Sequence, residues 1–238
     1  MRKIGTPFFI CNPKSYLYGE ESLKLALAAD KFAEEYGVEI FFTAPFADLA
    51  NIKDQTKNVI VTAQHMDSLF PGRGMGHVLP ESLKAAGVEA VFLNHAEHSL
   101  TLTTLVKTIK RAKELEIITI VCADCLDEAV AIAKLGPDIL LCEPTDLIGT
   151  GKTSSFDYII ETTTKIKEID ESILVMQASG ISTGEDVYNT IIHGADGTGA
   201  TSGIVKASNQ AKRLEEMIQA IVKAKNDKSK NDKSKNNL

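Results

Sequence analysis

The stretch IITIVCADCLDEAVAIAKLGPDILLCEP, residues 117–144, decides the fold of this chain. It opens with the apolar run 117–122, continues through a segment of helical period over 126–136 that ends in a glycine, and returns to a second apolar run over 138–142. Continuous apolar runs, rather than alternating ones, are typical of parallel strands covered on both faces. The stretch is therefore predicted to be a strand–helix–strand unit of a parallel sheet.

The same unit recurs on both sides of this stretch. Strands are predicted at 7–11, 39–43, 59–63, 90–93, 117–122, 138–142, 173–177 and 195–201. Helices are predicted at 20–37, 102–116, 126–136, 155–169 and 210–225, with another beginning at the capping pattern of residues 182–185. Eight units predict an eight-stranded parallel (β/α)8 barrel. A doubly wound sheet is disfavoured, because it has fewer strands and places its glycine-rich loop after the first one, where this chain has Asn12-Pro13-Lys14.

Composition narrows the possible partners. The net charge is −6 although residues 223–238 carry six Lys and two Asp, so the rest of the chain is strongly acidic, which argues against a nucleic-acid surface. No apolar run is long enough for a membrane span, and the apolar stretch near the start is too short for a signal peptide. We expect a cytoplasmic protein with one barrel domain over 1–225. A disordered Lys/Asn/Asp/Ser tail is expected over 226–238, since its tandem repeat has almost nothing to bury.

Two cysteines, Cys122 and Cys125, form a C-x-x-C pair. Such a pair can be a redox couple or half of a zinc site, but a structural zinc usually needs a second pair, which this sequence lacks. We therefore expect buried or solvated thiols and no metal.

Polar side chains concentrate where the predicted strands end. In a barrel these ends meet on one face, which carries the active site. The residues placed there are Asn12, Lys14, Gln64, His65, Asn94, His95, Glu97, Glu143, Ser179, Gly180, Ser182, Ser202 and Gly203.

The loop after the sixth strand can be interpreted in two ways. Its end, Gly151-Lys152-Thr153, resembles the end of a phosphate-binding P-loop, but Asp146 occupies the position that such a loop reserves for its first glycine. Its beginning, Glu143-Pro144, instead suggests a strand-end carboxylate followed by a loop that closes over a site. The second interpretation accounts for more of the residues.

These motifs together resemble the triosephosphate isomerase family, and in particular its compact archaeal-type branch. The matching segments are Asn12-Pro13-Lys14, Asn94-His95-Ala96-Glu97, and Glu143-Pro144 with Ile148-Gly149-Thr150-Gly151, supported by residues 63–67, 76–81 and 180–187. The resemblance extends from residue 8 to about residue 220.

The resemblance implies an enzyme of glycolysis and gluconeogenesis that interconverts dihydroxyacetone phosphate and glyceraldehyde 3-phosphate through an enediolate. Glu143 would be the general base, and His95, at the start of a short helix, would polarise the carbonyl as a neutral imidazole. Lys14 would stabilise the enediolate, and Asn12 would orient Lys14 and contact the substrate. Glu97 would hold loops in place or contact a neighbouring subunit. The implied reaction needs no cofactor.

The implied substrate is a small phosphorylated sugar held largely by backbone N–H groups. The residues concerned are Ile148, Gly149, Gly180, Ser182, Thr201, Ser202 and Gly203. Residues 64–81 carry exposed-looking apolar groups, and the equivalent family loop inserts beside a neighbour's active site, so a homodimer or homotetramer is expected.

Two features depart from the family pattern. Ala96 replaces a serine that contacts the catalytic carboxylate in the family, and Gly199 and Ala200 suggest extra room beside the phosphate loops. These departures leave open a related isomerase of another small sugar phosphate, such as a four-carbon one, or a non-catalytic sugar-phosphate-binding paralogue.

Overall fold

The computed structural model describes residues 3–144 and 153–235. Its eight strands are all parallel and form a closed barrel in which each strand pairs with the next and β1 pairs with β8. The strands are β1 (Phe8–Cys11), β2 (Ile40–Ala44), β3 (Ile60–Ala63), β4 (Ala90–Leu93), β5 (Ile118–Ala123), β6 (Ile139–Cys142), β7 (Leu174–Gln177) and β8 (Gly197–Ala200). The predicted (β/α)8 barrel is confirmed, and every strand lies within two residues of its predicted position.

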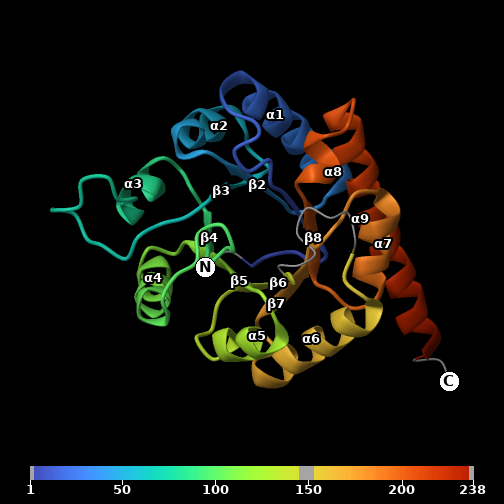
Figure 1. The fold of residues 1–238 in the computed structure, drawn as a ribbon. Coiled ribbons are helices and arrows are strands. Elements are labelled where there is room, and N and C mark those ends of the chain that lie inside the picture. Colours follow the sequence, from blue (N-terminus) through green and yellow to red (C-terminus); the bar gives the residue numbers. More distant parts are fainter. Residues whose placement is uncertain (1–2, 145–152, 236–238) are drawn as a thin grey trace.

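Helices surround the barrel (Figure 1). They are α1 (Gly19–Tyr36), α2 (Leu49–Gln55), α3 (Pro80–Ala85), α4 (Leu102–Glu114), α5 (Leu126–Ala133), α6 (Phe156–Ile169), α7 (Gly184–Ile192), α8 (Ser202–Val205) and α9 (Gln210–Lys235), with a short 3-10 helix, η1 (Phe46–Asp48). The short elements α2, α3 and η1 were not predicted, because so few residues carry no clear helical period. Among the described helices, none has both the length and the apolar character needed to cross a membrane.

The C-terminal helix α9 extends beyond the expected end of the domain, and it projects past the barrel in Figure 1. Residues 226–235, expected to be disordered, belong to this helix; residues 236–238 lie outside the described part. Helix extension is favourable once the first turns are packed, because each added residue gains a backbone bond. Local contacts add to it, since the Tyr188 hydroxyl donates to Asp227 Oδ2 (3.2 Å) and the Ser229 hydroxyl donates to the Lys225 carbonyl (2.9 Å).

The strand side chains divide into two apolar cores. In β1, Phe8 and Ile10 point into the barrel, whereas Phe9 and Cys11 point outward to the helices. The same alternation holds around the barrel, so the lumen and the layer between strands and helices are both filled. This double burial explains why the strand sequences are continuously apolar.

Strand β8 is glycine-rich because its neighbours occupy the space. A Cβ added at Gly197 would lie 2.3 Å from the ring of Phe8, and one added at Gly199 would lie 2.5 Å from the carbonyl oxygen of Ile10 and 2.8 Å from Met176 Cε. Ala200 is buried, and its carbonyl accepts the Asn12 N–H at 3.2 Å. The expectation that Gly199 leaves extra room is therefore wrong, whereas the same expectation for Ala200 stays a prediction.

The segment between β3 and α3 extends away from the barrel (Figure 1). Asp67 closes its base: the Asp67 N–H donates to the Val78 carbonyl (3.0 Å), and the Val78 N–H donates to Asp67 Oδ2 (2.7 Å). Phe70 lies under the guanidinium of Arg111, whose carbon is 3.9 Å from the ring centroid, whereas Met75 is fully exposed.

Candidate active site

A cavity of about 290 Å³ opens at the carboxyl ends of the strands, and we call it the main cavity. The residues predicted to do the chemistry, Lys14, His95 and Glu143, all line it, although they follow β1, β4 and β6. Asn12 and Glu97 lie in the same wall. The barrel topology thus brings together side chains that are far apart in the sequence, as expected for this fold.

Lys14 is held in place through its own backbone. Its φ of 49° lies in the left-handed region, which is unusual for a residue with a side chain. The Lys14 N–H donates to Asn12 Oδ1 (3.0 Å), and its carbonyl accepts from Gln64 Nε2 (3.0 Å). Asn12 therefore orients Lys14, as the family resemblance implies, and Gln64 adds a second restraint.

Glu97 has a more direct place in the site than its sequence position suggested. Its Oε1 accepts a hydrogen bond from Lys14 Nζ at 2.8 Å, and this bond lowers the pKa of Glu97. The Glu97 carboxylate and the Lys14 ammonium thus form an ion pair in the wall of the main cavity. This pairing has no sequence signal, because the two residues follow different strands.

His95 lies in a tight turn rather than at the start of a helix. The His98 N–H donates to the His95 carbonyl (2.7 Å), and α4 begins only at Leu102. The Glu97 N–H donates to His95 Nδ1 (3.1 Å), so Nδ1 is an acceptor and a neutral ring carries its proton on Nε2. Burial and the nearby charge of Lys14 lower the pKa of His95 and favour this neutral form.

Asn94 anchors the turn that carries His95. It has a φ of 58°, and its side-chain amide donates to the Cys122 carbonyl and to Glu128 Oε1, both at 3.0 Å. Its Oδ1 accepts the Leu100 N–H at 2.9 Å. One side chain thus connects β4 to β5 and α5 and fixes the start of the turn. The role of Glu128 could not be predicted, since it lies within a helix.

Glu143 follows β6 directly, and its N–H donates to the Ala123 carbonyl (3.0 Å). Burial raises the pKa of Glu143, although the charge of Lys14 opposes the shift. A raised pKa makes the carboxylate a stronger base. The predicted ligand residues Ile148 and Gly149 lie outside the described residues, as does the rest of the loop over 145–152.

The predicted phosphate-binding residues after β7 and β8 lie side by side. Gly180, Thr201 and Ser202 line the main cavity. A Cβ at Gly203 would lie 2.7 Å from both the Ile181 carbonyl oxygen and Ser182 Cα, so the two loops touch through their backbones. The Ser182 N–H, however, donates to Asp186 Oδ2 (3.0 Å), which leaves it engaged inside the protein.

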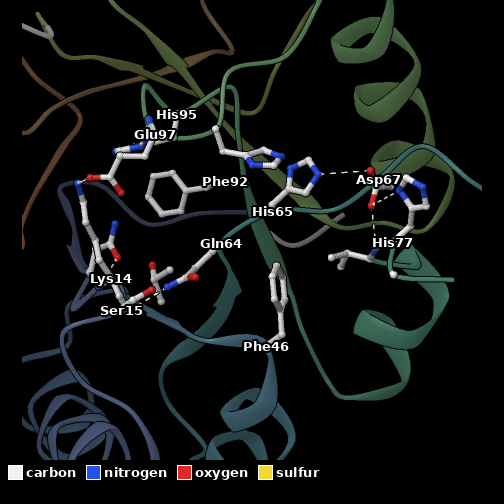
Figure 2. A pocket seen from close by; sticks show the side chains of 15 residues that line it. Lys14, Ser15, Phe46, Gln64, His65, Asp67, His77, Phe92, His95 and Glu97 are labelled. Carbon is white, nitrogen blue, oxygen red and sulfur yellow. Dashed lines mark hydrogen bonds and ion pairs between the residues drawn. The ribbon is translucent and has the colours of Figure 1, made fainter. Parts of the chain in front are cut away.

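A second cavity of about 480 Å³ adjoins the main cavity (Figure 2). The far wall of the second cavity is formed by the strand-end pair Gln64-His65 with Asp67 and His77. The residues that line both cavities are Asn12, Lys14, Phe92, His95 and Glu97. Lys14 and His95 therefore face both cavities, whereas Glu143 lines only the main cavity. The second cavity lies beside the base of the projecting segment 64–81.

The C-x-x-C pair is not arranged as a couple. Cys122 is buried within the barrel, whereas Cys125 is exposed just before α5, and both are free thiols. Burial raises the pKa of Cys122, which disfavours the reactive thiolate. Cys122 is therefore a packing residue.

Comparison with known proteins gives a consistent result. The family model of triosephosphate isomerase matches residues 7–225. The triosephosphate isomerase of Methanocaldococcus jannaschii is 36% identical over 217 residues, covering 89% of this chain and 99% of that protein. Those of Sulfolobus acidocaldarius (34%; 92% of this chain and 96% of that one) and Methanobacterium bryantii (36%; 91% and 97%) are similar to the same extent.

Proposed function

We infer that this chain, which belongs to the triosephosphate isomerase family, interconverts dihydroxyacetone phosphate and glyceraldehyde 3-phosphate. One observation carries the proposal beyond family membership. Lys14, His95 and Glu143 face one cavity, with the His95 ring held so that Nε2–H is its free donor. A cation, a neutral donor and a buried base are the three groups that proton transfer next to a carbonyl requires.

In the proposed reaction Glu143 removes a proton from the carbon beside the substrate carbonyl. The Nε2–H of His95 donates to the carbonyl oxygen, which becomes the hydroxyl or alkoxide of the enediolate. Lys14 stabilises the negative charge that develops there. The hydroxyl proton of the first carbon passes to the former carbonyl oxygen by way of His95 Nε2, and the protonated Glu143 returns its proton to the former carbonyl carbon. The carbonyl thus moves to the first carbon with no external reductant. No cofactor takes part in these steps.

The phosphate group is proposed to lie against the backbone of Gly180 and of Thr201 to Gly203. Support comes from the position of these residues in the cavity wall and from the first N–H groups of a helix, which have no intrahelical acceptor. The N–H of Ser182 is a weaker candidate for phosphate binding than the sequence suggested, because it already donates a hydrogen bond to Asp186 Oδ2. Ile148 and Gly149 stay candidates from the sequence alone.

The test is a coupled isomerase assay with glyceraldehyde 3-phosphate beside four-carbon aldose phosphates. We expect efficient turnover of the triose phosphate and little turnover of the longer sugars. Gly199 no longer supports the alternative substrates, since the space beside it is filled, so they rest on Ala96 and Ala200. Absence of triose turnover, with binding of a phosphorylated inhibitor retained, would contradict the proposal and support a binding protein.

We also propose that the cytoplasmic enzyme is a homodimer or homotetramer assembled through residues 64–81. The projecting segment and the second cavity beside Lys14 and His95 support this arrangement, because the segment of one copy needs a cavity on the other copy to enter. Met75 at the exposed end of the segment is a large apolar side chain with no cover within the described chain.

A further inference from the structure

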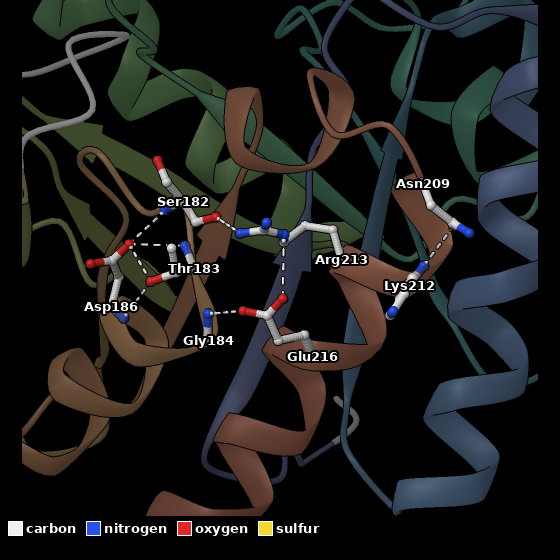
Figure 3. Close-up of polar contacts among 8 residues, drawn as sticks. All are labelled: Ser182, Thr183, Gly184, Asp186, Asn209, Lys212, Arg213 and Glu216. Carbon is white, nitrogen blue, oxygen red and sulfur yellow. Dashed lines mark hydrogen bonds and ion pairs between the residues drawn. The ribbon is translucent and has the colours of Figure 1, made fainter.

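Two side chains in the first turns of α9 form hydrogen bonds with the segment Ser182–Thr183–Gly184, which leads from β7 into α7 (Figure 3). Arg213 Nη1 donates to the Ser182 carbonyl at 2.6 Å, and the Gly184 N–H donates to Glu216 Oε1 at 2.9 Å. The two side chains also pair with each other, Arg213 Nε to Glu216 Oε2, at 3.4 Å. Two residues one turn apart thus hold both ends of a three-residue segment.

The opposite side of this segment is held by α7. Asp186 Oδ2 accepts the N–H groups of Ser182 (3.0 Å) and Thr183 (2.9 Å) and the hydroxyl of Thr183 (2.9 Å). This capping box fixes the segment relative to its own helix. The Arg213–Glu216 pair fixes it relative to a different helix, and therefore relative to the rest of the barrel.

The segment Ser182–Thr183–Gly184 lies next to the proposed phosphate site. Gly203, at the start of α8, approaches the backbone of Ile181 and Ser182 so closely that a Cβ there would lie 2.7 Å from each. The Ser182 hydroxyl donates to the Gly180 carbonyl (3.0 Å), and Gly180 lines the main cavity. A shift of the segment would therefore move the wall of the cavity.

Stability alone does not account for this pair. The side chains of Arg213 and Glu216 are 31% and 49% exposed, and solvent-exposed ion pairs contribute little to the stability of the fold. Both members nevertheless end on backbone atoms of one loop. Such contacts have their main effect on geometry, and displacements of about 1 Å in a binding site are enough to change a reaction rate or an affinity.

We propose that Arg213 and Glu216 are positioning residues that hold the loop after β7 at the spacing that binds the anionic group of the substrate. The proposal rests on the proposed isomerase function for its substrate. It assigns no contact between Arg213 and that substrate. Arg213 acts through the Ser182 carbonyl and Glu216 through the Gly184 N–H.

The test compares Arg213→Met with Lys212→Met, which removes the same charge from the neighbouring exposed position of α9. For Arg213→Met we expect KM for the triose phosphate, and the inhibition constant of inorganic phosphate, to rise about tenfold, with kcat changed about twofold or less. Lys212→Met should leave both constants near wild type. Equal effects in the two variants would mean that only net charge matters, and would overturn the proposal.

Glu216 gives a graded comparison. Glu216→Gln keeps an oxygen for the Gly184 N–H but loses the charge paired with Arg213, so its rise in KM should be smaller than that of Glu216→Ala. Arg213→Lys should likewise fall between Arg213→Met and wild type, because an ammonium keeps one donor but not the fork. A drop in kcat with KM unchanged would contradict a positioning role.

A readout independent of catalysis separates this proposal from the proposed function. Amide hydrogen exchange over residues 179–186 should be faster in Arg213→Met than in wild type and in Lys212→Met, at equal melting temperature. If wild type shows no isomerase activity, the proposed function fails, but the exchange comparison still decides whether the pair holds the loop. Unchanged exchange in Arg213→Met overturns the proposal.

Discussion

At the scale of single residues, burial and one lysine set the ionisation of the site. Burial disfavours charge on both Glu143 and His95, so it raises the pKa of Glu143 and lowers the pKa of His95. The positive charge of Lys14 reinforces the shift at His95 and opposes it at Glu143. The result is a strong base beside a neutral hydrogen-bond donor, which is the combination that enolisation requires.

The raised pKa of Glu143 predicts the acid side of the pH–rate profile. Activity requires the carboxylate, so kcat/KM should fall as the pH drops through a value above about 4.3, the ordinary pKa of Glu. His95, with its lowered pKa, is neutral at pH values above the ordinary His pKa of about 6.5 and adds no loss of activity there. The measurement is kcat/KM from pH 4 to 9. A decline that begins only at the ordinary Glu value contradicts the assignment.

Glu143→Gln should lose activity and gain stability at once. Loss of the general base lowers kcat by at least about 10²–10⁴-fold. A carboxyl whose pKa is raised in the folded state lowers stability as the pH rises through that pKa, and neutral Gln removes this penalty at pH 7. Thermal unfolding and the isomerase assay check both effects.

Glu97→Gln is the matched comparison, with the opposite sign. The Lys14 hydrogen bond lowers the pKa of Glu97, so the folded state gains stability above the unfolded pKa and loses it as the pH falls. The variant should therefore show an unchanged or lower melting temperature at pH 7. A melting temperature that rises for Glu97→Gln and falls for Glu143→Gln would reverse the interpretation of both.

At the scale of elements, strands and long helices could be predicted because their signals are local. A continuous apolar run such as 138–142 needs no knowledge of its neighbours to be recognised as a buried strand. The strand order then places Lys14, His95 and Glu143 on one face. What could not be predicted are contacts set by packing between distant segments.

The missed contacts have a common physical cause. Glu97 and Lys14 follow different strands, and Asn94 follows β4 whereas Glu128 lies on α5, so neither pair has a sequence spacing that marks it. Gly199 was misinterpreted for the same reason. A Cβ there would meet the Ile10 carbonyl oxygen and Met176 Cε on the neighbouring strands, and a missing side chain leaves no room when a neighbour fills it.

Asp30, on α1, connects that helix to the chain entering β3. Its carboxylate accepts the N–H groups of Lys57 (2.8 Å), Asn58 and Val59 (3.0 Å). Burial alone would raise the pKa of Asp30, but these donors outweigh burial and lower it. The stabilisation is therefore present above the unfolded pKa and is lost as the pH falls.

Asp30→Ala should lower the free energy of unfolding by about 1–3 kcal/mol at pH 7, because three backbone donors lose their acceptor. Urea unfolding measures the change, with Asp54→Ala, an exposed position on α2, as the control. The difference between the variants should shrink below pH 4. Equal midpoints at pH 7 would show that solvent replaces Asp30.

At the scale of the whole molecule, the projecting segment 64–81 exposes a large apolar side chain that no other described residue covers. Phe70 is held by Arg111, but Met75 is fully exposed. If residues 64–81 enter a second copy, Met75→Glu should shift the protein towards monomers, because a charge would have to be buried in the interface. Activity should fall with it, since the second cavity shares Lys14 and His95 with the main cavity.

Sedimentation velocity over a range of concentrations checks this expectation. Leu27→Glu, at a partly exposed apolar position on α1, is the control and should keep the wild-type assembly. A Met75→Glu protein that sediments and turns over like wild type would exclude this segment as the assembly contact.

The pairing of β1 with β8 has a consequence for how this sequence can evolve. The ring of Phe8 occupies the place of a Gly197 side chain, so neither position is free to vary while the other stays fixed. A larger residue at 197 becomes acceptable only after Phe8 has shrunk, and a smaller residue at 8 leaves a void that only a larger 197 repairs. Such sign epistasis joins the two ends of the barrel sequence. Libraries that diversify one strand at a time would therefore miss the alternative closures that a two-position search could find.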